Sequence, residues 1–541
     1  MISRIKLNNS IYHSLLIVVL FLSFYTGFKG IDYGHHWDEL RVISSIKNSA
    51  NTGLILPRWY HYPSMCYNIA LLTSIPKILI SKIGFEIKGE YYSSKKYLLH
   101  VRISHLIIVL ISAVWIYGLV YFWRNSLPEA LLSAVLLCFS WEVAYHARWI
   151  AADGILMQFS ILSIFLIFIS IRKDNFIFWL RIAAIAAGLS CGSKYPGGAL
   201  IIPVLLTNKI FNKEVLNQKR FEYIKLTIIF ICSYIITTPG TLLEPLVFIR
   251  DVKLVMGQYW NGWSDAFTVG KFFEIAFLST QYFALVLFSK YWSVSLFFFC
   301  LMFMGCYAII IENKSIAVIF LSLPLFYILY MWAQSTMIVR NYLILIPFMA
   351  ILSARGYFYI FNLISQRFYR GIFIFILFIC LFQNFKWLHL ASQSIVNREQ
   401  NKSEFIETNN IAYIYGGYGM KEWDKKILSH NNGIEIAHHI SENKDKIFYL
   451  SKGIKNIIPK KIGERFLNIT DNFSKADEYI FISSYEHSLK PDIKNWFFAN
   501  RFNRYQVISG PYEVNINYYP IWAGDERAIS IPINRLQDRH I

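Results

Sequence analysis

Acidic, basic and imidazole side chains gather in a short polar segment near the start of the chain. The sequence IDYGHHWDEL places Asp38 and Glu39 side by side shortly after an apolar run, and Arg58 and His61 follow in RWYHYP. Adjacent carboxylates raise each other's pKa unless a cation or a hydrogen-bond donor compensates. Charged groups at a membrane surface with such neighbours favour a functional cleft over a solvated loop end.

Charged residues recur at three later positions where apolar runs begin or end. Arg148 precedes Asp153 by five residues in YHARWIAADGILMQF. Lys194 lies in the turn GSKYPG, and Arg340 precedes a long apolar run in MIVRNYLILIPF. Each position alone has a structural explanation, such as a helix-terminal acid or a snorkelling lysine. Because all of them are predicted on the same membrane face as Asp38, we interpret them as parts of one site.

The side chains of this predicted site suit a phosphate and a proton transfer. Arginine and lysine bind phosphate oxygens through charge-assisted hydrogen bonds, and a carboxylate can accept a proton from a hydroxyl or an amine. A site that faces outward has no access to cytoplasmic ATP or nucleotide sugars, so an activated donor must arrive in the bilayer. A lipid phosphate is the donor group that fits these residues.

Membrane-spanning helices are the elements predicted to position the site. Of 541 residues, 55% are hydrophobic and 16% are charged, whereas soluble domains carry about 25% charged residues. A hydrocarbon core is crossed by about 20 mostly apolar residues, and the backbone there must be helical. We expect about eleven spans, near residues 11–28, 99–123, 127–143, 153–171, 177–192, 197–208, 223–239, 291–311, 315–334, 341–361 and 371–388.

The basic residues set the predicted orientation of these spans. The formal net charge of +19 is concentrated in short connections between apolar runs, a distribution that indicates cytoplasmic loops rather than nucleic-acid binding. The N-terminus is then cytoplasmic, and the loops at 29–98 and 240–290 face outward. Residues 63–83 read as an interfacial helix, whereas 272–290 could be interfacial or could cross the membrane.

The C-terminal part of the chain has a different character. After residue 388 polar residues become frequent, and short β-type runs occur at 446–451, 479–485, 512–517 and 528–533. The predicted fold is therefore an all-α polytopic membrane domain over residues 1–388 with interfacial helices, followed by a small soluble extracytoplasmic α+β domain over 389–541.

The order of the short motifs resembles a known family. An acidic pair in the first outward loop is followed by H-x-P at His61, R-x₄-D ending at Asp153, G-S-K-Y around Lys194, and R-N-Y-x₄-P beginning at Arg340. This order is similar to the membrane-embedded C-type (GT-C) glycosyltransferases, in particular their bacterial protein-mannosyltransferase-like and aminoarabinose-transferase-like branch. The resemblance covers residues 1–390.

The resemblance implies roles for individual residues. Asp38, together with Glu39, would be the catalytic acidic pair, with Asp38 as general base and Asp153 as a further acid of the site. The cationic side chains would hold the lipid phosphate, with Lys194 and Arg340 as the main contacts and Arg148 and Arg58 as further ones. His61 and Tyr62 stand where relatives have a metal-binding glutamate and a phosphate-binding lysine. A divalent metal ion, with His61 as a ligand, is thus an optional cofactor.

The implied function is that of a glycosyltransferase of the inner (plasma) membrane. It would move a hexose or pentose from a polyprenyl-phosphate-linked donor to an extracytoplasmic acceptor of the cell envelope, with inversion. The acceptor could be a glycan, a lipid or a protein, and the membrane lipids would be the other partners. The alternatives to this function are a lipid-linked glycan flippase, a transporter, a polymerase and a non-catalytic glycan-binding protein. Transporters often contain inverted repeats, and the sequence shows none.

Overall fold

The computed structural model describes most of the predicted membrane domain and part of the C-terminal region. The described residues are 9–29, 31, 37–82, 95–212, 216–260, 269–285, 287–289, 291–334, 339–396, 430–459, 468–482, 506–509 and 528–533. The chain forms two compact units, of which the first contains residues 37–260 and 267–392 and the second contains the strands. Each unit is described by itself below.

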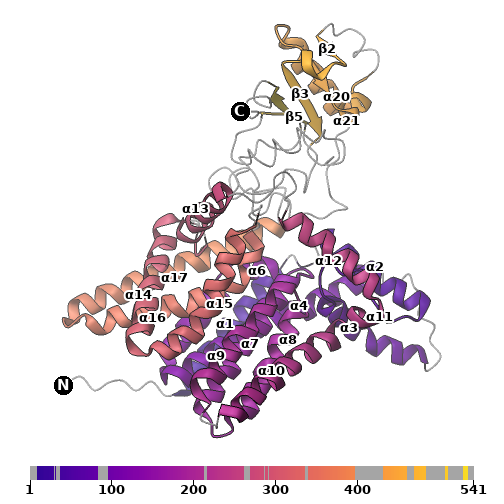
Figure 1. Cartoon of the computed structure of the whole chain (residues 1–541). Helices are drawn as coiled ribbons and strands as arrows, with labels where there is room; N and C mark the ends of the chain where they lie inside the picture. Colours follow the sequence, from indigo (N-terminus) through magenta and orange to yellow (C-terminus); the bar gives the residue numbers. More distant parts are fainter. Residues whose placement is uncertain are drawn as a thin grey trace. The chain divides into compact units, whose positions relative to one another are not determined.

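The first unit is a bundle of helices (Figure 1). Its elements are α1 (Asn9–Phe28), α2 (Trp37–Thr52), α3 (Met65–Lys82), α4 (Lys95–Arg124), α5 (Leu127–Cys138), α6 (Trp141–His146), α7 (Ala152–Arg172), α8 (Phe176–Cys191), η2 (Tyr195–Leu200), α9 (Ile201–Phe211), α10 (Leu216–Thr237), α11 (Gly240–Leu243), α12 (Pro245–Trp260), α13 (Val269–Leu285), α14 (Trp292–Glu312), α15 (Lys314–Trp332), η3 (Val339–Leu345), α16 (Ile346–Leu363) and α17 (Arg367–Val396).

Many of these helices suit a bilayer. Within the described residues, seven helical segments are long and apolar enough to cross a membrane, and four further apolar helices are shorter. The seven segments are Asn9–Phe28, Lys96–Arg124, Ala152–Arg172, Trp292–Glu312, Lys314–Trp332, Arg340–Leu363 and Arg367–His389. The prediction of a multi-pass, mostly helical membrane protein is confirmed at this level, while the count of eleven spans stays a prediction.

Each of the eleven predicted spans coincides with helix, but three of them are interrupted. The predicted span 127–143 is divided into α5 and α6, and the spans at 197–208 and 341–361 each begin with a short 3₁₀ helix, η2 and η3. Ser140 starts α6 by accepting a hydrogen bond from the Val143 N–H at 3.5 Å. These interruptions place non-helical backbone close to the predicted site residues.

Close helix contacts hold the bundle together where small residues occur. At Gly305 on α14, an added Cβ would lie 1.9 Å from the Leu352 carbonyl oxygen of α16. Only glycine permits two helices to approach this closely, as is common between helices in membranes. Any larger residue at this position must push α14 and α16 apart.

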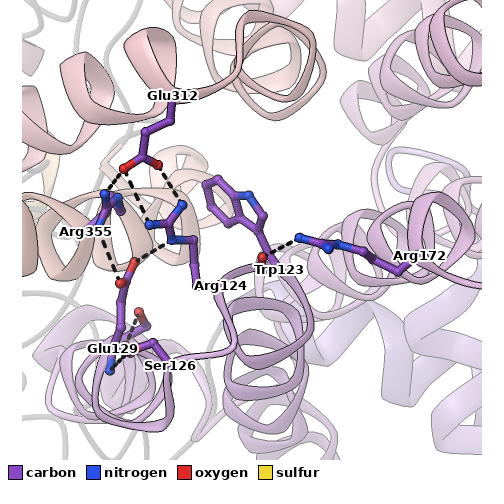
Figure 2. A network of polar contacts seen from close by, with 8 residues as sticks. Trp123, Arg124, Ser126, Glu129, Arg172, Glu312 and Arg355 are labelled. Carbon is purple, nitrogen blue, oxygen red and sulfur yellow. Dashed lines mark hydrogen bonds and ion pairs between the residues drawn. The ribbon is translucent and has the colours of Figure 1, made fainter.

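A network of charged residues ties four helices together at the end where α4 and α14 finish (Figure 2). Arg355 of α16 pairs with Glu312 of α14 and lies 3.5 Å from Glu129 of α5. Arg124 of α4 donates to Glu312 at 2.6 Å and lies 3.8 Å from Glu129. Two arginines thus balance two glutamates, and both Glu129 and Arg355 are at most 4% exposed.

Removing one member of this network should destabilise the bundle. Arg355→Met leaves Glu129 buried with Arg124 as its remaining cation, so we expect unfolding to become easier by about 2 kcal/mol, below the ~3–5 kcal/mol of a fully broken buried pair. Titration with a denaturing detergent, followed by circular dichroism, measures the change. Arg367→Met, at an exposed residue of α17, is the control, and equal stability of the two variants would contradict the expectation.

The second unit contains a five-stranded sheet in the order β2-β1-β3-β5-β4. The strands are β1 (Phe448–Leu450), β2 (Ile469–Thr470), β3 (Glu478–Ile482), β4 (Gln506–Ser509) and β5 (Ala528–Pro532), with the helical elements α20 (His430–Glu442), α21 (Lys452–Ile457) and η5 (Phe473–Lys475). β1 pairs in parallel with β2 and β3, whereas β5 pairs antiparallel with β3 and β4.

The sheet and its helices enclose a small apolar core. Ile436 and Ile440 of α20 pack against Phe448 of β1 and Ile480 of β3, and Ile454 of α21 joins them. Three of the four predicted strand segments coincide with β1, β3 and β5. The fourth, at 512–517, lies outside the described residues.

Candidate functional site

Three of the predicted site residues meet in one buried cluster. The Lys194 ammonium donates to the Asp153 carboxylate and to the Asn341 side-chain oxygen, both at 2.6 Å. The Arg340 Nε lies 3.9 Å from the other Asp153 oxygen. Asp153, Lys194, Arg340 and Asn341 are between 2% and 6% exposed. We call these four residues the Asp153 cluster.

Two aromatic residues complete the surroundings of the two cations. The Arg340 guanidinium lies 5.6 Å from the centre of the Trp149 ring, and the Lys194 ammonium lies 5.7 Å from that of Tyr62. Arg340 also donates to the Tyr62 hydroxyl at 3.3 Å. Aromatic faces attract cations most strongly where water is excluded. The rings therefore help to hold both cations in place.

The breaks between helices bring the Asp153 cluster together. Asp153 is the second residue of α7, Lys194 lies between α8 and η2, and Arg340 and Asn341 lie in η3. The Tyr327 hydroxyl of α15 holds η3 by donating to the Asn341 carbonyl at 2.8 Å. Each cluster residue thus stands at a helix end, where a polar side chain does not interrupt an apolar helix.

Gly192 allows the Lys194 turn to approach α10. An added Cβ at Gly192 would lie 1.9 Å from the Thr237 hydroxyl oxygen. The Gly192 carbonyl accepts a hydrogen bond from the Met65 N–H at 3.0 Å, which joins the start of α3 to the same turn. The glycine of the G-S-K-Y motif therefore serves close packing rather than contact with a substrate.

A pocket opens next to the Asp153 cluster. Its cavity volume is about 20 Å³, room for about one water molecule, within about 460 Å³ of empty space that includes open solvent. Its wall combines α2, the segment before α3, and the start of α7, with the lining residues Val42, Ser45, Pro57, Trp59, Tyr62, Pro63, Ser64, Cys66, Tyr67, Ile150, Ala152 and Asp153. A ligand in this pocket would touch both the Asp153 carboxylate and the Tyr62 ring.

Of the predicted acidic pair, the structure describes the side chain of Glu39 but only the backbone of Asp38. Asp38 lies in the first turn of α2, the helix that supplies Val42 and Ser45 to the pocket, and its side chain is outside the described part. Glu39 is fully buried, and Arg102 binds both of its oxygens, at 2.8 and 2.5 Å. Its carboxylate anchors α2 through this ion pair, and its part in the catalytic acidic pair stays a prediction.

Glu39 also holds the chain segment that precedes Asp153. One of its oxygens accepts a hydrogen bond from the Ile150 N–H at 2.9 Å, and Arg102 additionally donates to the Ile31 carbonyl at 2.8 Å. Arg102 is an α4 residue that the sequence did not single out. An arginine within an apolar run is costly without a partner, and that cost was the available signal.

Arg148 is bound by the end of another helix. Its side chain is 1% exposed, and it donates to the Thr26 and Gly27 carbonyl oxygens at 2.5 and 3.1 Å. These carbonyls belong to the last turn of α1, where a cation favourably meets the negative end of the helix dipole. Arg148 thus holds the end of α1, and its contact with a lipid phosphate stays a prediction.

Arg58 lies outside the Asp153 cluster. It has a left-handed backbone, with φ of 54°, and its exposed side chain pairs with Glu244 at 3.1 Å. The Tyr60 hydroxyl donates to the same carboxylate at 2.8 Å. Burial and the neighbouring Glu244 raise the pKa of Tyr60, so its hydroxyl stays protonated and can donate. These contacts fasten the segment before α3 to α12 and so shape the pocket wall.

His61 does not lie in a metal-binding group of described residues. Its ring packs against Trp59 with the centroids 5.1 Å apart. Among the residues that the structure describes, no three His, Cys, Asp or Glu side chains are close enough to hold a metal ion. His61 as a ligand of a metal ion therefore stays a prediction.

A buried polar group beside the cluster was missed in the sequence. The His146 Nε2 lies 3.3 Å from Glu142, whose other carboxylate oxygen accepts a hydrogen bond from the Tyr282 hydroxyl of α13. The His146 ring centre lies 5.7 Å from that of Trp149, and the Arg340 guanidinium lies over the face of the same Trp149 ring. Glu142 and His146 are four residues apart on α6, a helical spacing that gave the available signal.

A comparison with protein-family models places part of this region in a family. Residues 93–236 match the family described as dolichyl-phosphate-mannose-protein mannosyltransferase. The resemblance noted in the sequence is confirmed over this segment. It runs from α4 to α10 and includes Asp153 and Lys194 of the cluster, whereas Asp38 and Arg340 lie outside it. A comparison with curated proteins finds no match.

Solved membrane enzymes are similar to this chain at low identity. The oligosaccharyltransferase of Archaeoglobus fulgidus, in complex with Zn and sulfate, is 10% identical, with a TM-score of 0.49 over 96% of this chain and 75% of that one. ArnT from Cupriavidus metallidurans, bound to undecaprenyl phosphate, is 11% identical, with a TM-score of 0.46 over 96% and 97% of the two chains.

Proposed function

We propose that this protein is an inverting membrane glycosyltransferase that uses a polyprenyl-phosphate-linked sugar. The acceptor would be a glycan, lipid or protein outside the cytoplasm. The observation that carries the proposal is the Asp153 cluster, in which two buried cations share one carboxylate beside an open pocket. The match of residues 93–236 to a family named for a lipid-phosphate sugar donor supports the same proposal.

The charge of the cluster favours an anionic ligand. Lys194 and Arg340 contribute two positive charges and Asp153 contributes one negative charge, so the cluster carries a net charge of +1. A phosphate that entered the pocket would bring negative charge next to these two cations. An arginine and a lysine that share one carboxylate can also share the oxygens of one phosphodiester.

The proposed reaction is a single displacement at the anomeric carbon. The acceptor oxygen or nitrogen forms a bond to this carbon while the bond from carbon to the phosphate oxygen breaks, and Asp38 takes the acceptor's proton. The transition state has oxocarbenium character, and the negative charge grows on the departing lipid phosphate. Lys194 and Arg340 stabilise that charge because they are held in place before the reaction starts. Asp153 positions both cations.

Mass spectrometry of envelope glycans and polyprenyl-phosphate lipids tests this function. A deletion strain should lack one sugar on one envelope molecule and should accumulate the matching monoglycosylated lipid. Complementation with the intact gene should restore both. Accumulation of larger lipid-linked glycans would instead favour a flippase or a polymerase and would overturn the proposal.

Arg340→Ala should affect the donor more than the acceptor. Loss of the guanidinium removes one phosphate contact, so we expect the KM for the lipid-linked donor to rise about tenfold, the effect of one charge-assisted hydrogen bond. The KM for the acceptor should change less than about twofold. Steady-state kinetics in proteoliposomes measure both constants. Arg250→Ala, at an exposed arginine of α12, is the control, and equal rises in both constants would contradict the donor assignment.

A further inference from the structure

A second pocket lies at the end of α7 opposite to the Asp153 cluster. Asp153 and Arg172 are 19 residues apart on α7, which corresponds to about 29 Å along the helix axis. The pocket encloses about 890 Å³ of empty space, part of it open to solvent. It is lined by Trp123, Arg124, Phe168, Ile171, Arg172, Phe211, Ile309, Glu312, Asn313 and Ile316.

This pocket lies where four candidate membrane spans end or begin. The candidate spans of α4, α7 and α14 all end at it, with Arg124, Arg172 and Glu312 as their last residues, and the span of α15 begins there. By the distribution of basic residues, this is the face predicted to be cytoplasmic. A ligand at this depth has one part in the hydrocarbon and another at the surface.

The lining of the pocket has an apolar inner part and a charged rim. Phe168 and Ile309 are 1% exposed and Ile316 is 6% exposed, so the inner wall is apolar. At the rim, the side chains of Arg124 and Glu312 are 25% and 30% exposed. An apolar wall beneath a charged rim suits a lipid. The lipid tail packs against the apolar wall, and the headgroup contacts the charged rim.

The charges of the rim distinguish between kinds of headgroup. Arg124, Arg355, Glu129 and Glu312 neutralise one another in the network of Figure 2. Arg172 is different: it donates one hydrogen bond to the Trp123 carbonyl at 2.8 Å, and it makes no ion pair with any residue that the structure describes. The pocket therefore carries a net charge of +1, which an anionic headgroup complements.

We propose that this pocket binds one anionic phospholipid of the adjacent leaflet. Its phosphate would lie on the Arg172 guanidinium, which Trp123 orients, and one acyl chain would run along the partly exposed Ile171 and Phe211 of the lining. The bound lipid would join the ends of α4, α7 and α14. This proposal is independent of the proposed transfer reaction, because the pocket and the Asp153 cluster are at opposite ends of α7.

Native mass spectrometry of the purified full-length protein tests the proposal. The probes are dioleoylphosphatidylglycerol and dioleoylphosphatidylcholine, added to protein that has been freed of endogenous lipid. The first should bind to one saturable site about tenfold more tightly than the second. Arg172→Gln should weaken phosphatidylglycerol binding about tenfold, the scale of one charge-assisted phosphate contact. Lys173→Gln, at the adjacent exposed lysine outside the pocket lining, should leave it unchanged.

A second variant tests the apolar wall without changing charge. Ile316→Trp fills part of the pocket and should also weaken phosphatidylglycerol binding, whereas Ile310→Trp, at an exposed residue of α14 outside the lining, should not. Thermal unfolding in detergent checks that the variants are folded. Equal binding of the two lipids, equal binding by Arg172→Gln and the wild type, or displacement by millimolar inorganic phosphate would each overturn the proposal. A preference for polyprenyl phosphate over phosphatidylglycerol would overturn it too.

Discussion

Asp38→Asn is expected to lower the rate of sugar transfer by about 10²- to 10⁴-fold, the range that a positioned general base contributes. Asparagine has the shape of aspartate but cannot accept the acceptor's proton. Asp38 lies in the first turn of α2, and the same helix supplies Val42 and Ser45 to the pocket beside Asp153. Transfer from a synthetic polyprenyl-phosphate sugar in proteoliposomes measures the rate.

The control for Asp38 removes a carboxylate at the other end of the bundle. Asp174→Asn, two residues after α7, changes an exposed acid and should leave the rate unchanged. Binding of the donor to the Asp38 variant should stay within about twofold of wild type, because the phosphate contacts are on Lys194 and Arg340. A transfer rate close to wild type in Asp38→Asn would rule out this residue as the base.

Arg102→Met is expected to destabilise the membrane unit by about 3–5 kcal/mol, the cost of leaving one partner of a buried ion pair alone. Glu39 is 0% exposed and Arg102 is 1% exposed, and the pair joins α2 to α4 through two hydrogen bonds. Detergent-induced unfolding measures the loss. A change below about 1 kcal/mol would show that water or another cation reaches Glu39.

A double variant distinguishes the structural role of Glu39 from a catalytic one. In Glu39→Leu/Arg102→Met both charges are gone, so part of the stability should return, although the Ile150 N–H and the Ile31 carbonyl lose a partner each. If Glu39 only anchors α2, the folded double variant keeps measurable transfer. Full loss of transfer in a stable double variant would make Glu39 part of the catalytic acidic pair after all.

Most helices could be predicted because the bilayer restricts the choice of structure. Runs of apolar residues that cross a membrane must be helical, so α1, α4, α7, α14 and α17 follow from composition. The divisions between α5 and α6 and before α9 and α16 could not be predicted in this way. There the backbone leaves the helix because side chains from other helices, such as Tyr327 at η3, satisfy its polar groups.

Part of the candidate site could also be predicted. Asp153, Lys194 and Arg340 were recognised as charges at the ends of apolar runs, and the structure brings Lys194 and Arg340 each within 4 Å of the Asp153 carboxylate. The partners Asn341 and Trp149 were not predicted, because neutral polar and aromatic residues are common at membrane interfaces. Nothing in their local sequence distinguishes a residue that holds a cation from one that only packs.

The sequence by itself determined which residues carry charge in an apolar chain, and hence the membrane class, the helices and the candidate charges. The tertiary structure decided which partners those charges have. Glu39 and Arg148 have the same types and the same local spacing as the other candidates, yet Arg102 and the end of α1 occupy them. The physical reason is that the pairing of a buried charge depends on residues far away in the chain, and only folding brings such residues into contact.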